Sequence, residues 1–162
     1  MMIVIVSFVV LVILSIYSFS TLIITMSNEL NNLIKDLPQV KILNATISID
    51  ISTNTTMINC SLINYGQRSV IFSYSNTKLY VIYRDTNNVT RIKIMKYGED
   101  WYISSIKING IEYNLSKNII YEISPGMEFI IYISINDVFK SNTPVTLILS
   151  IRGVRIEYTT SV

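Results

Sequence analysis

The first 26 residues set the strongest limit on what this chain can become. Residues 1–26 contain no charged side chain and consist mainly of isoleucine, valine and leucine. A helix of about 20 apolar residues spans the hydrocarbon core of a bilayer, so this run is long enough to cross one. Its serines are compatible with that, because a helical serine can return its hydroxyl hydrogen bond to the preceding turn. We therefore predict a transmembrane helix over residues 1–26.

A cleaved secretory signal is the alternative interpretation of this run. No basic residue precedes the apolar stretch, which is also longer than the about 7–15 residues of a signal-peptide core. Ser18-Phe19-Ser20 is a poor small-x-small cleavage site. No Lys-Gly or Arg-Gly pair precedes the run to mark pilin-type processing. These features favour a retained membrane anchor.

A short helical stalk is predicted after the anchor, over residues 27–38. Leu30, Leu33, Ile34 and Leu37 recur at helical spacing. Pro38 ends the helix, because proline disfavours the helical region for the residue before it. The leucine stripe can contact a second copy of the helix or the domain that follows, and the sequence leaves this choice open.

After Pro38 the hydrophobic period changes from helical to two. In residues 45–51 apolar and polar side chains alternate strictly, which is the pattern of a half-buried β-strand. A series of short strands follows from such segments, with turn residues roughly every 8–12 positions. The further segments are 57–63, 69–73, 79–84, 90–95, 105–108, 111–114, 119–123, 127–135, 145–151 and 154–158. We predict an all-β, immunoglobulin-like sandwich over residues 39–162, with a closed barrel as the alternative.

Asn109-Gly110 is the strongest local signal in the predicted domain. It lies between two alternating segments, residues 105–108 and 111–114. Asparagine and glycine tolerate the positive φ angles of a type I′ turn. The pair therefore predicts a two-residue β-hairpin.

Composition argues against an enzyme. The chain has no histidine, the commonest general base and zinc ligand, and its single cysteine excludes an intramolecular disulfide. Cys60 shares a strand face with Ile58 and Leu62, so we expect it to be a small buried apolar residue. Glu99 and Asp100 are expected in a solvated turn, and no GxGxxG, P-loop or zinc spacing occurs. We therefore predict no catalytic site, no cofactor and no metal.

The charge pattern gives no reason to expect nucleic-acid binding. The net charge is only +2, and the 13 basic residues are scattered along the chain. Partners are therefore expected to be a membrane and other proteins.

Aromatic residues in the middle of the domain are the best candidates for a binding surface. Tyrosine and tryptophan are enriched at protein interfaces, although half-buried packing at a sandwich edge would explain them equally well. The strand 79–83 is apolar on both faces, so something must cover part of it. We predict a homodimer through this sheet. The candidate interface residues are Tyr80, Ile82, Tyr83, Trp101 and Tyr102.

Five Asn-x-Ser/Thr sequons favour a domain outside the membrane. Asn44, Asn54, Asn59, Asn88 and Asn114 are the candidate glycosylation sites. Lysines at positions 35 and 41 would favour the opposite orientation, but long domains translocate largely regardless of charge. We therefore predict a single-pass protein of the cell membrane with its C-terminal domain on the extracellular, pseudo-periplasmic side.

Two turns carry a family resemblance. Asn64-Tyr65-Gly66 follows one strand and precedes a short apolar strand, and Pro125-Gly126 forms a corner before the strand 127–135. This pairing resembles the immunoglobulin-like domains of archaeal surface proteins. Together with the N-terminal helix, the layout is similar to the archaellum accessory proteins F and G, small membrane-anchored sandwiches of the archaeal flagellar motor. The sequence does not decide between the F type and the G type.

The resemblance implies a structural anchor. Such a protein would be a stator component that fixes the archaellum motor to the cell envelope by binding the surface-layer protein and other archaellum components. The family has no catalytic residues to carry over. A membrane-anchored extracellular receptor or solute-binding domain is the alternative, and it would require a concave apolar pocket with a few convergent polar groups.

Overall fold

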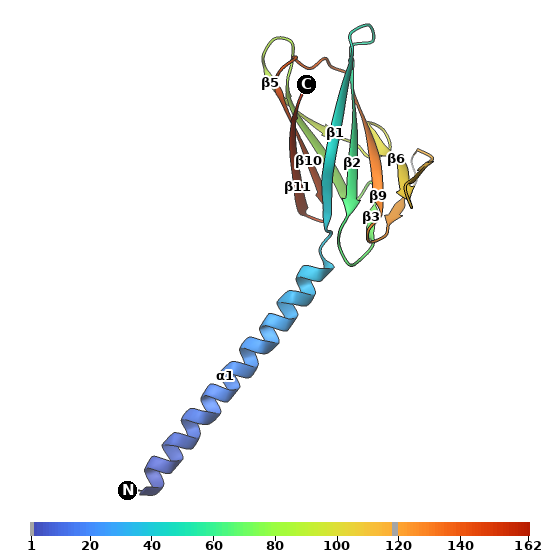
Figure 1. Ribbon diagram of the computed structural model, residues 1–162. Coiled ribbons are helices and arrows are strands. Elements are labelled where there is room, and N and C mark those ends of the chain that lie inside the picture. The colour runs from blue at the N-terminus through green and yellow to red at the C-terminus, as the bar shows by residue number, and fades with distance from the viewer. Residues whose placement is uncertain (1, 118–119) are drawn as a thin grey trace. The chain divides into compact units, whose positions relative to one another are not determined.

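A long helix forms the first of two compact units. The computed structural model describes residues 2–117 and 120–162, and it separates a helical unit ending at Leu37 from a β-domain beginning at Pro38. Figure 1 shows α1, Met2–Asp36, as one unbroken helix. Its end two residues before Pro38 fits the restriction that proline places on the preceding residue. Met1 and Ile119, which begin the predicted anchor and one predicted strand, lie outside the described residues.

The helix carries a stretch suited to a membrane. Val12–Leu33 is long and apolar enough to cross one. Ser20 Oγ donates a hydrogen bond to the Tyr17 carbonyl oxygen at 2.9 Å, and Thr25 Oγ1 donates to that of Thr21 at 2.9 Å. These polar side chains are therefore satisfied within the helix, as predicted for its serines.

The leucine stripe of the predicted stalk continues on the same helix. Leu30, Leu33 and Leu37 are exposed, whereas the side chain of Ile34 lies outside the described part. These leucines therefore remain available for a contact.

The β-domain consists of two main antiparallel sheets and a small third one (Figure 1). The five-stranded sheet has the order β1 Val40–Asp50, β2 Thr55–Asn64, β9 Glu128–Ile135, β6 Trp101–Ile108 and β7 Ile111–Asn114. The four-stranded sheet has the order β11 Val154–Ser161, β10 Pro144–Ile151, β4 Thr77–Arg84 and β5 Thr90–Met95. The small sheet pairs β3 Val70–Phe72 with β8 Tyr121–Ile123. The predicted all-β, immunoglobulin-like sandwich behind an apolar helix is confirmed.

β1 and β6 begin five and four residues earlier than the alternation predicts, and both contain a bulge. The register of β1 shifts between Ile42 and Asn44, and that of β6 shifts between Ile103 and Ser105. A bulge adds one residue to a strand and reverses the parity of the side chains beyond it. Strict alternation therefore detects only the part of each strand that follows the bulge.

The core lies between the sheets and is built from inward residues of the strands other than β7, whose four residues are exposed. Its largest fully buried side chains are Trp101, Phe72, Phe129 and Phe139. Cys60 is fully buried with Ile58 and Leu62, as predicted, and burial raises the pKa of its thiol to about 12. A thiol in that state packs as a small apolar group and is a poor nucleophile.

The predicted β6–β7 hairpin is confirmed. Ile108 pairs with Ile111 across the turn, and the two residues between them have positive φ angles, 52° at Asn109 and 79° at Gly110. These are the angles of a type I′ turn, whose twist matches that of the flanking strands.

Asn64, at the end of β2, joins the two turns that carry the family resemblance. Its side chain is fully buried, and Nδ2 donates to the carbonyl oxygens of Arg68 and Ile123, both at 2.9 Å. Its Oδ1 accepts a hydrogen bond from the Gly66 amide at 3.0 Å. Its own carbonyl oxygen accepts one from Gly126 N at 2.7 Å. Asn64 thus forms hydrogen bonds with both the Asn-x-Gly turn and the Pro-Gly corner.

Gly66 is required by the same arrangement. A Cβ atom at this position would lie 3.0 Å from Gln39 Cβ and 3.1 Å from Asn64 Oδ1. A larger residue would therefore require the Gln39 and Asn64 side chains to shift by a few tenths of an ångström.

We expect Asn64→Ala to lower the free energy of unfolding by roughly 2–4 kcal/mol, because it removes the hydrogen bonds of the buried Asn64 side chain to the Arg68 and Ile123 carbonyl oxygens and to the Gly66 amide. The full chain in detergent, unfolded thermally and followed by circular dichroism of the β-domain, would measure this. Asn136→Ala, at an exposed asparagine, is the matched control and should change stability little. Equal effects of the two substitutions would contradict the role given to Asn64.

Candidate functional site

The outer side of the four-stranded sheet carries an apolar patch. We call it the outer apolar face, and it consists of Tyr80, Ile82, Ile92, Ile94 and Ile148. Ile92 and Ile94 on the edge strand β5 are 68% and 65% exposed. Tyr80 pairs with both Ile94 and Ile148, so the patch crosses three neighbouring strands. Contiguous exposed apolar side chains of this kind mark contact surfaces more often than chance positions do.

The structure corrects the predicted interface at two positions. Tyr83 is 3% exposed and Trp101 is fully buried, so both belong to the core and not to a surface. Tyr83 stacks on Phe139 with ring centroids 4.1 Å apart, and Trp101 packs edge-on against Tyr97 at 4.8 Å. Neighbouring residues of a strand point to opposite faces, and Tyr83 has the inward parity of Val81.

The other three predicted residues lie on two different faces. Tyr80 and Ile82 are half-buried members of the outer apolar face. Tyr102 lies on the outer side of the five-stranded sheet, where its ring is 5.4 Å from that of Tyr132 and 5.1 Å from Lys117 Nζ. The five residues therefore do not form one surface.

Sequence reasoning missed three members of the outer apolar face. Ile92, Ile94 and Ile148 occur in segments whose alternation was recognised, but the side on which each isoleucine lies was not assigned. The signal was present in β5, where Ile92 and Ile94 alternate with Arg91, Lys93 and Met95. Charged residues usually mark the solvent side, whereas here Arg91 turns towards the end of the core and binds Asp85.

Two shallow hollows lie on the surface of the domain, and the second of them reaches the outer apolar face. One of about 430 Å³ is lined by Tyr74, Tyr97 and Ile120 among others, with Glu99 at its side. A second of about 250 Å³ shares Tyr74 and Tyr97 and reaches Tyr80. Glu99 lies in the solvated turn predicted for it and forms an ion pair with Lys96 at 3.2 Å, which raises the pKa of that lysine. Both hollows are open, unlike the enclosed sites that bury most of a small ligand.

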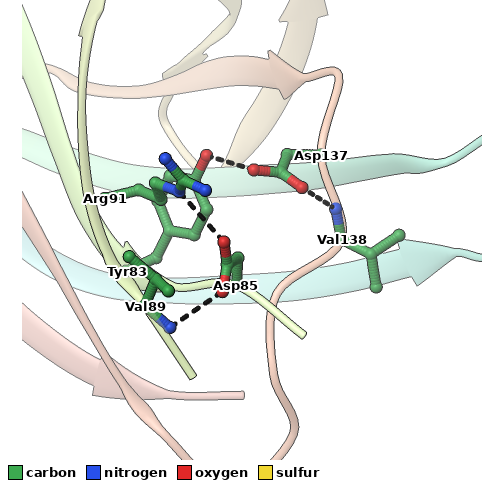
Figure 2. Close-up of polar contacts among 6 residues, drawn as sticks. All are labelled: Tyr83, Asp85, Val89, Arg91, Asp137 and Val138. Atoms are coloured by element: carbon green, nitrogen blue, oxygen red, sulfur yellow. Dashed lines mark hydrogen bonds and ion pairs between the residues drawn. The ribbon is translucent and has the colours of Figure 1, made fainter. Parts of the chain in front are cut away.

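A polar cluster lies at the end of the sandwich where β4 and β9 finish (Figure 2). Tyr83 Oη donates to Asp137 Oδ2 at 2.6 Å, and Arg91 Nε donates to Asp85 Oδ2 at 2.9 Å. The Val89 amide donates to Asp85 Oδ1 at 2.8 Å, and the Val138 amide donates to Asp137 Oδ1 at 2.9 Å. Each carboxylate thus holds one loop against the sheet.

The electrostatics of this cluster fit a structural role. The Val89 amide, with the Arg91 guanidinium beside it, holds the pKa of Asp85 below its ordinary value. Burial, with the Asp137 carboxylate next to it, raises the pKa of Tyr83. Asp85 is kept ionised and Tyr83 neutral, which secures a donor and an acceptor for each hydrogen bond. A general acid–base pair would instead need a group poised near neutral pH.

We expect Tyr83→Phe to destabilise the domain by about 1–3 kcal/mol, because it removes a hydrogen bond to a charged acceptor and keeps the ring stacked on Phe139. Thermal unfolding of the full chain would measure the change. Tyr80→Phe is the control on the same strand, where the hydroxyl lies on the outer side and its loss should cost little. A larger effect at Tyr80 than at Tyr83 would contradict the burial assigned to these two residues.

All five sequon asparagines are exposed. Asn44 and Asn59 lie on the outer side of the five-stranded sheet, and Asn114 ends its edge strand β7. Asn54 lies in the turn between β1 and β2, and Asn88 in the turn between β4 and β5.

Metal ligands do not gather in the described part of the chain. Among residues 2–117 and 120–162, no group of three or more His, Cys, Asp or Glu side chains is placed to hold a metal ion. The absence of a cofactor and of catalysis remains a prediction from composition.

Comparisons with known proteins return solved structures alone. No family model and no curated protein match the chain. The archaellum periplasmic stator protein FlaG from Sulfolobus acidocaldarius is 20% identical, with 76% of this chain and 100% of that chain covered and a TM-score of 0.49. The FlaF and FlaG stator complex of the same organism is matched at 22% identity, 76% and 90% coverage, and a TM-score of 0.48.

A further match is a bacterial protein. The sporulation control protein Spo0M from Bacillus subtilis is 9% identical, with 78% of this chain and 49% of that chain covered and a TM-score of 0.36. Likeness at these levels does not say what the present chain does. In fold, the chain is similar to archaellum stator proteins, the family that its two turns resemble.

Proposed function

We propose that this protein is a non-enzymatic component of the archaeal motility machinery that anchors the archaellum motor to the cell envelope by binding the surface layer. The observation that carries the proposal is a β-sandwich behind a helical stretch that is long and apolar enough to span a membrane, with open hollows beside Tyr74 in place of an enclosed pocket. A flat contact face fits a protein that grips another protein, whereas a receptor for solutes needs an enclosed pocket.

The proposed location is the extracellular side of the cell membrane. The apolar stretch Val12–Leu33 supports a single-pass anchor. Five exposed sequons in the domain support the outer side, because N-glycosylation takes place there. A domain in this position can reach a surface layer directly.

The proposed occupant of the outer apolar face is a second copy of this chain. The face is about two strands wide on its exposed side and lies at the β5 edge, so two copies can meet there about a two-fold axis. Each contact would then occur twice, which suits a small self-complementary patch. Leu30 and Leu33, exposed on α1, are available for a contact between helices.

We expect Ile94→Asp to weaken the dimer at least tenfold, because it places a charge in the apolar contact. Sedimentation of the full chain in detergent would measure the dissociation constant. Ile111→Asp, at another exposed isoleucine on the edge strand of the other sheet, is the matched control and should leave the dimer intact. A wild-type protein that remains monomeric, or equal effects of the two substitutions, would contradict the proposed dimer.

We expect cross-linking in living cells, followed by purification of the full chain from their membranes, to recover surface-layer protein together with archaellum motor components. Cells that lack the protein should assemble archaella poorly, and they should also swim poorly. Ile111→Asp serves here as the control for an unspecific effect of placing a charge at an exposed isoleucine. Recovery of neither class of partner, with normal swimming of the deletion strain, would rule the anchor out.

A receptor or solute-binding domain is the second candidate. The hollow lined by Tyr74 and Tyr97 favours it, because aromatic walls beside a carboxylate can hold a small polar ligand. Tyr74→Ala should then abolish solute binding and leave swimming unchanged. The anchor predicts no such ligand.

A further inference from the structure

The asparagines of this domain are distributed unevenly between its two main sheets. The four strands β4, β5, β10 and β11 contain no asparagine. The five-stranded sheet carries three of the five sequon asparagines, namely Asn44, Asn59 and Asn114, and all three are exposed. The outer apolar face therefore lacks any acceptor for an N-linked sugar, whereas the opposite outer side has several.

The side-chain amides of the sequon asparagines are free to react. Within the part of the chain that the structure describes, none of the five Nδ2 groups donates a hydrogen bond. The asparagines that hold the fold together behave differently. Nδ2 of Asn64 donates to two carbonyl oxygens and that of Asn76 donates to the Ile71 carbonyl oxygen, and neither residue begins a sequon.

We propose that Asn44, Asn54, Asn59, Asn88 and Asn114 carry N-linked glycans, which shield the five-stranded sheet and the loops and leave the outer apolar face bare for protein contact. This inference rests on the outside location given under the proposed function. The sugar donor is an oligosaccharide linked through phosphate to a lipid. Asparagine Nδ2 attacks its C1 atom, the N–C1 bond forms and the C1–O bond breaks, and the lipid phosphate leaves with the electron pair while Nδ2 loses a proton.

Two of these sites lie where an unpaired strand edge needs protection. Asn44 is in β1 and Asn114 is in β7, the two edge strands of the five-stranded sheet. Edge strands present free backbone groups that can pair with another chain, and proteins commonly block them with bulges or charges. A glycan on each edge strand would block such pairing at both sides of this sheet. The bulge of β1 beside Asn44 acts in the same direction.

Asn88 shows that a glycan is compatible with the existing contacts. Its Oδ1 accepts hydrogen bonds from Arg84 Nη1 at 3.3 Å and Lys140 Nζ at 3.1 Å. Linkage to a sugar uses Nδ2 and leaves Oδ1 unchanged. Both hydrogen bonds would therefore persist in the glycosylated protein.

The test is mass spectrometry of peptides from the full chain, purified from membranes of the cells that naturally make it. We expect a sugar mass on each sequon asparagine. Exposed asparagines outside sequons, at positions 87, 109 and 142, are internal controls and should be unmodified. Absence of a glycan from any of Asn44, Asn59 or Asn114 overturns the proposed shielding of the sheet.

A variant pair isolates one site without touching its asparagine. Thr46→Val removes the sequon of Asn44 and keeps a β-branched side chain, so the protein should lose the mass of one glycan. Thr46→Ser preserves the sequon and should lose none. Equal glycan masses in the two variants would overturn the assignment of Asn44.

Protease treatment of intact cells separates failure of this inference from failure of the proposed function. An unmodified domain that the protease digests lies outside the membrane, so the glycans are refuted and the anchor stands. An unmodified domain that is protected lies inside, and then both proposals fall.

Discussion

The carboxamide of Asn64 is the contact on which the arrangement of the sandwich most depends. A buried polar group without a partner costs more than a typical hydrogen bond contributes, so strand ends inside a sandwich must be satisfied. Asn64 satisfies a carbonyl before β3, the carbonyl that ends β8, and the corner leading into β9. Because β9 pairs with β2 directly beyond this corner, the same residue helps to set their register, and a shift of one residue would turn every side chain to the opposite face.

The alternation of inward and outward side chains within each sheet decides which residues reach solvent on both sides of the domain. In β4 the inward set ends with Val81 and Tyr83, which leaves Tyr80 and Ile82 on the outer side. The same rule places Asn59 outside and Cys60 inside in β2. The outer apolar face and the side that carries the sequon asparagines thus both follow from the alternation of inward and outward side chains. Each of them belongs to a different sheet.

The sequence was sufficient to predict the fold but insufficient to predict which residues form the surface, and the reason is physical. Alternation, the Asn109-Gly110 turn and the apolar helix are local signals, and each of them predicted its element correctly. Where both faces of a strand are apolar, as in residues 79–83, alternation no longer says which parity is inward. The facing sheet decides this, so Tyr83 was assigned to an interface although it stacks on Phe139 in the core. The bulges in β1 and β6 hid the first parts of those strands in the same way.

A membrane tether changes how much contact area such a face needs. Association in solution must overcome the loss of translational and rotational freedom, which a patch of five side chains compensates poorly. Two chains anchored in one membrane have already lost much of that freedom, so the second contact behaves as an intramolecular one at a high effective concentration. Exposed leucines on α1 would supply the first contact and the outer apolar face the second. In the proposed dimer the helix would therefore do more than attach the domain, because the shared membrane would make a modest sheet face sufficient for a stable pair.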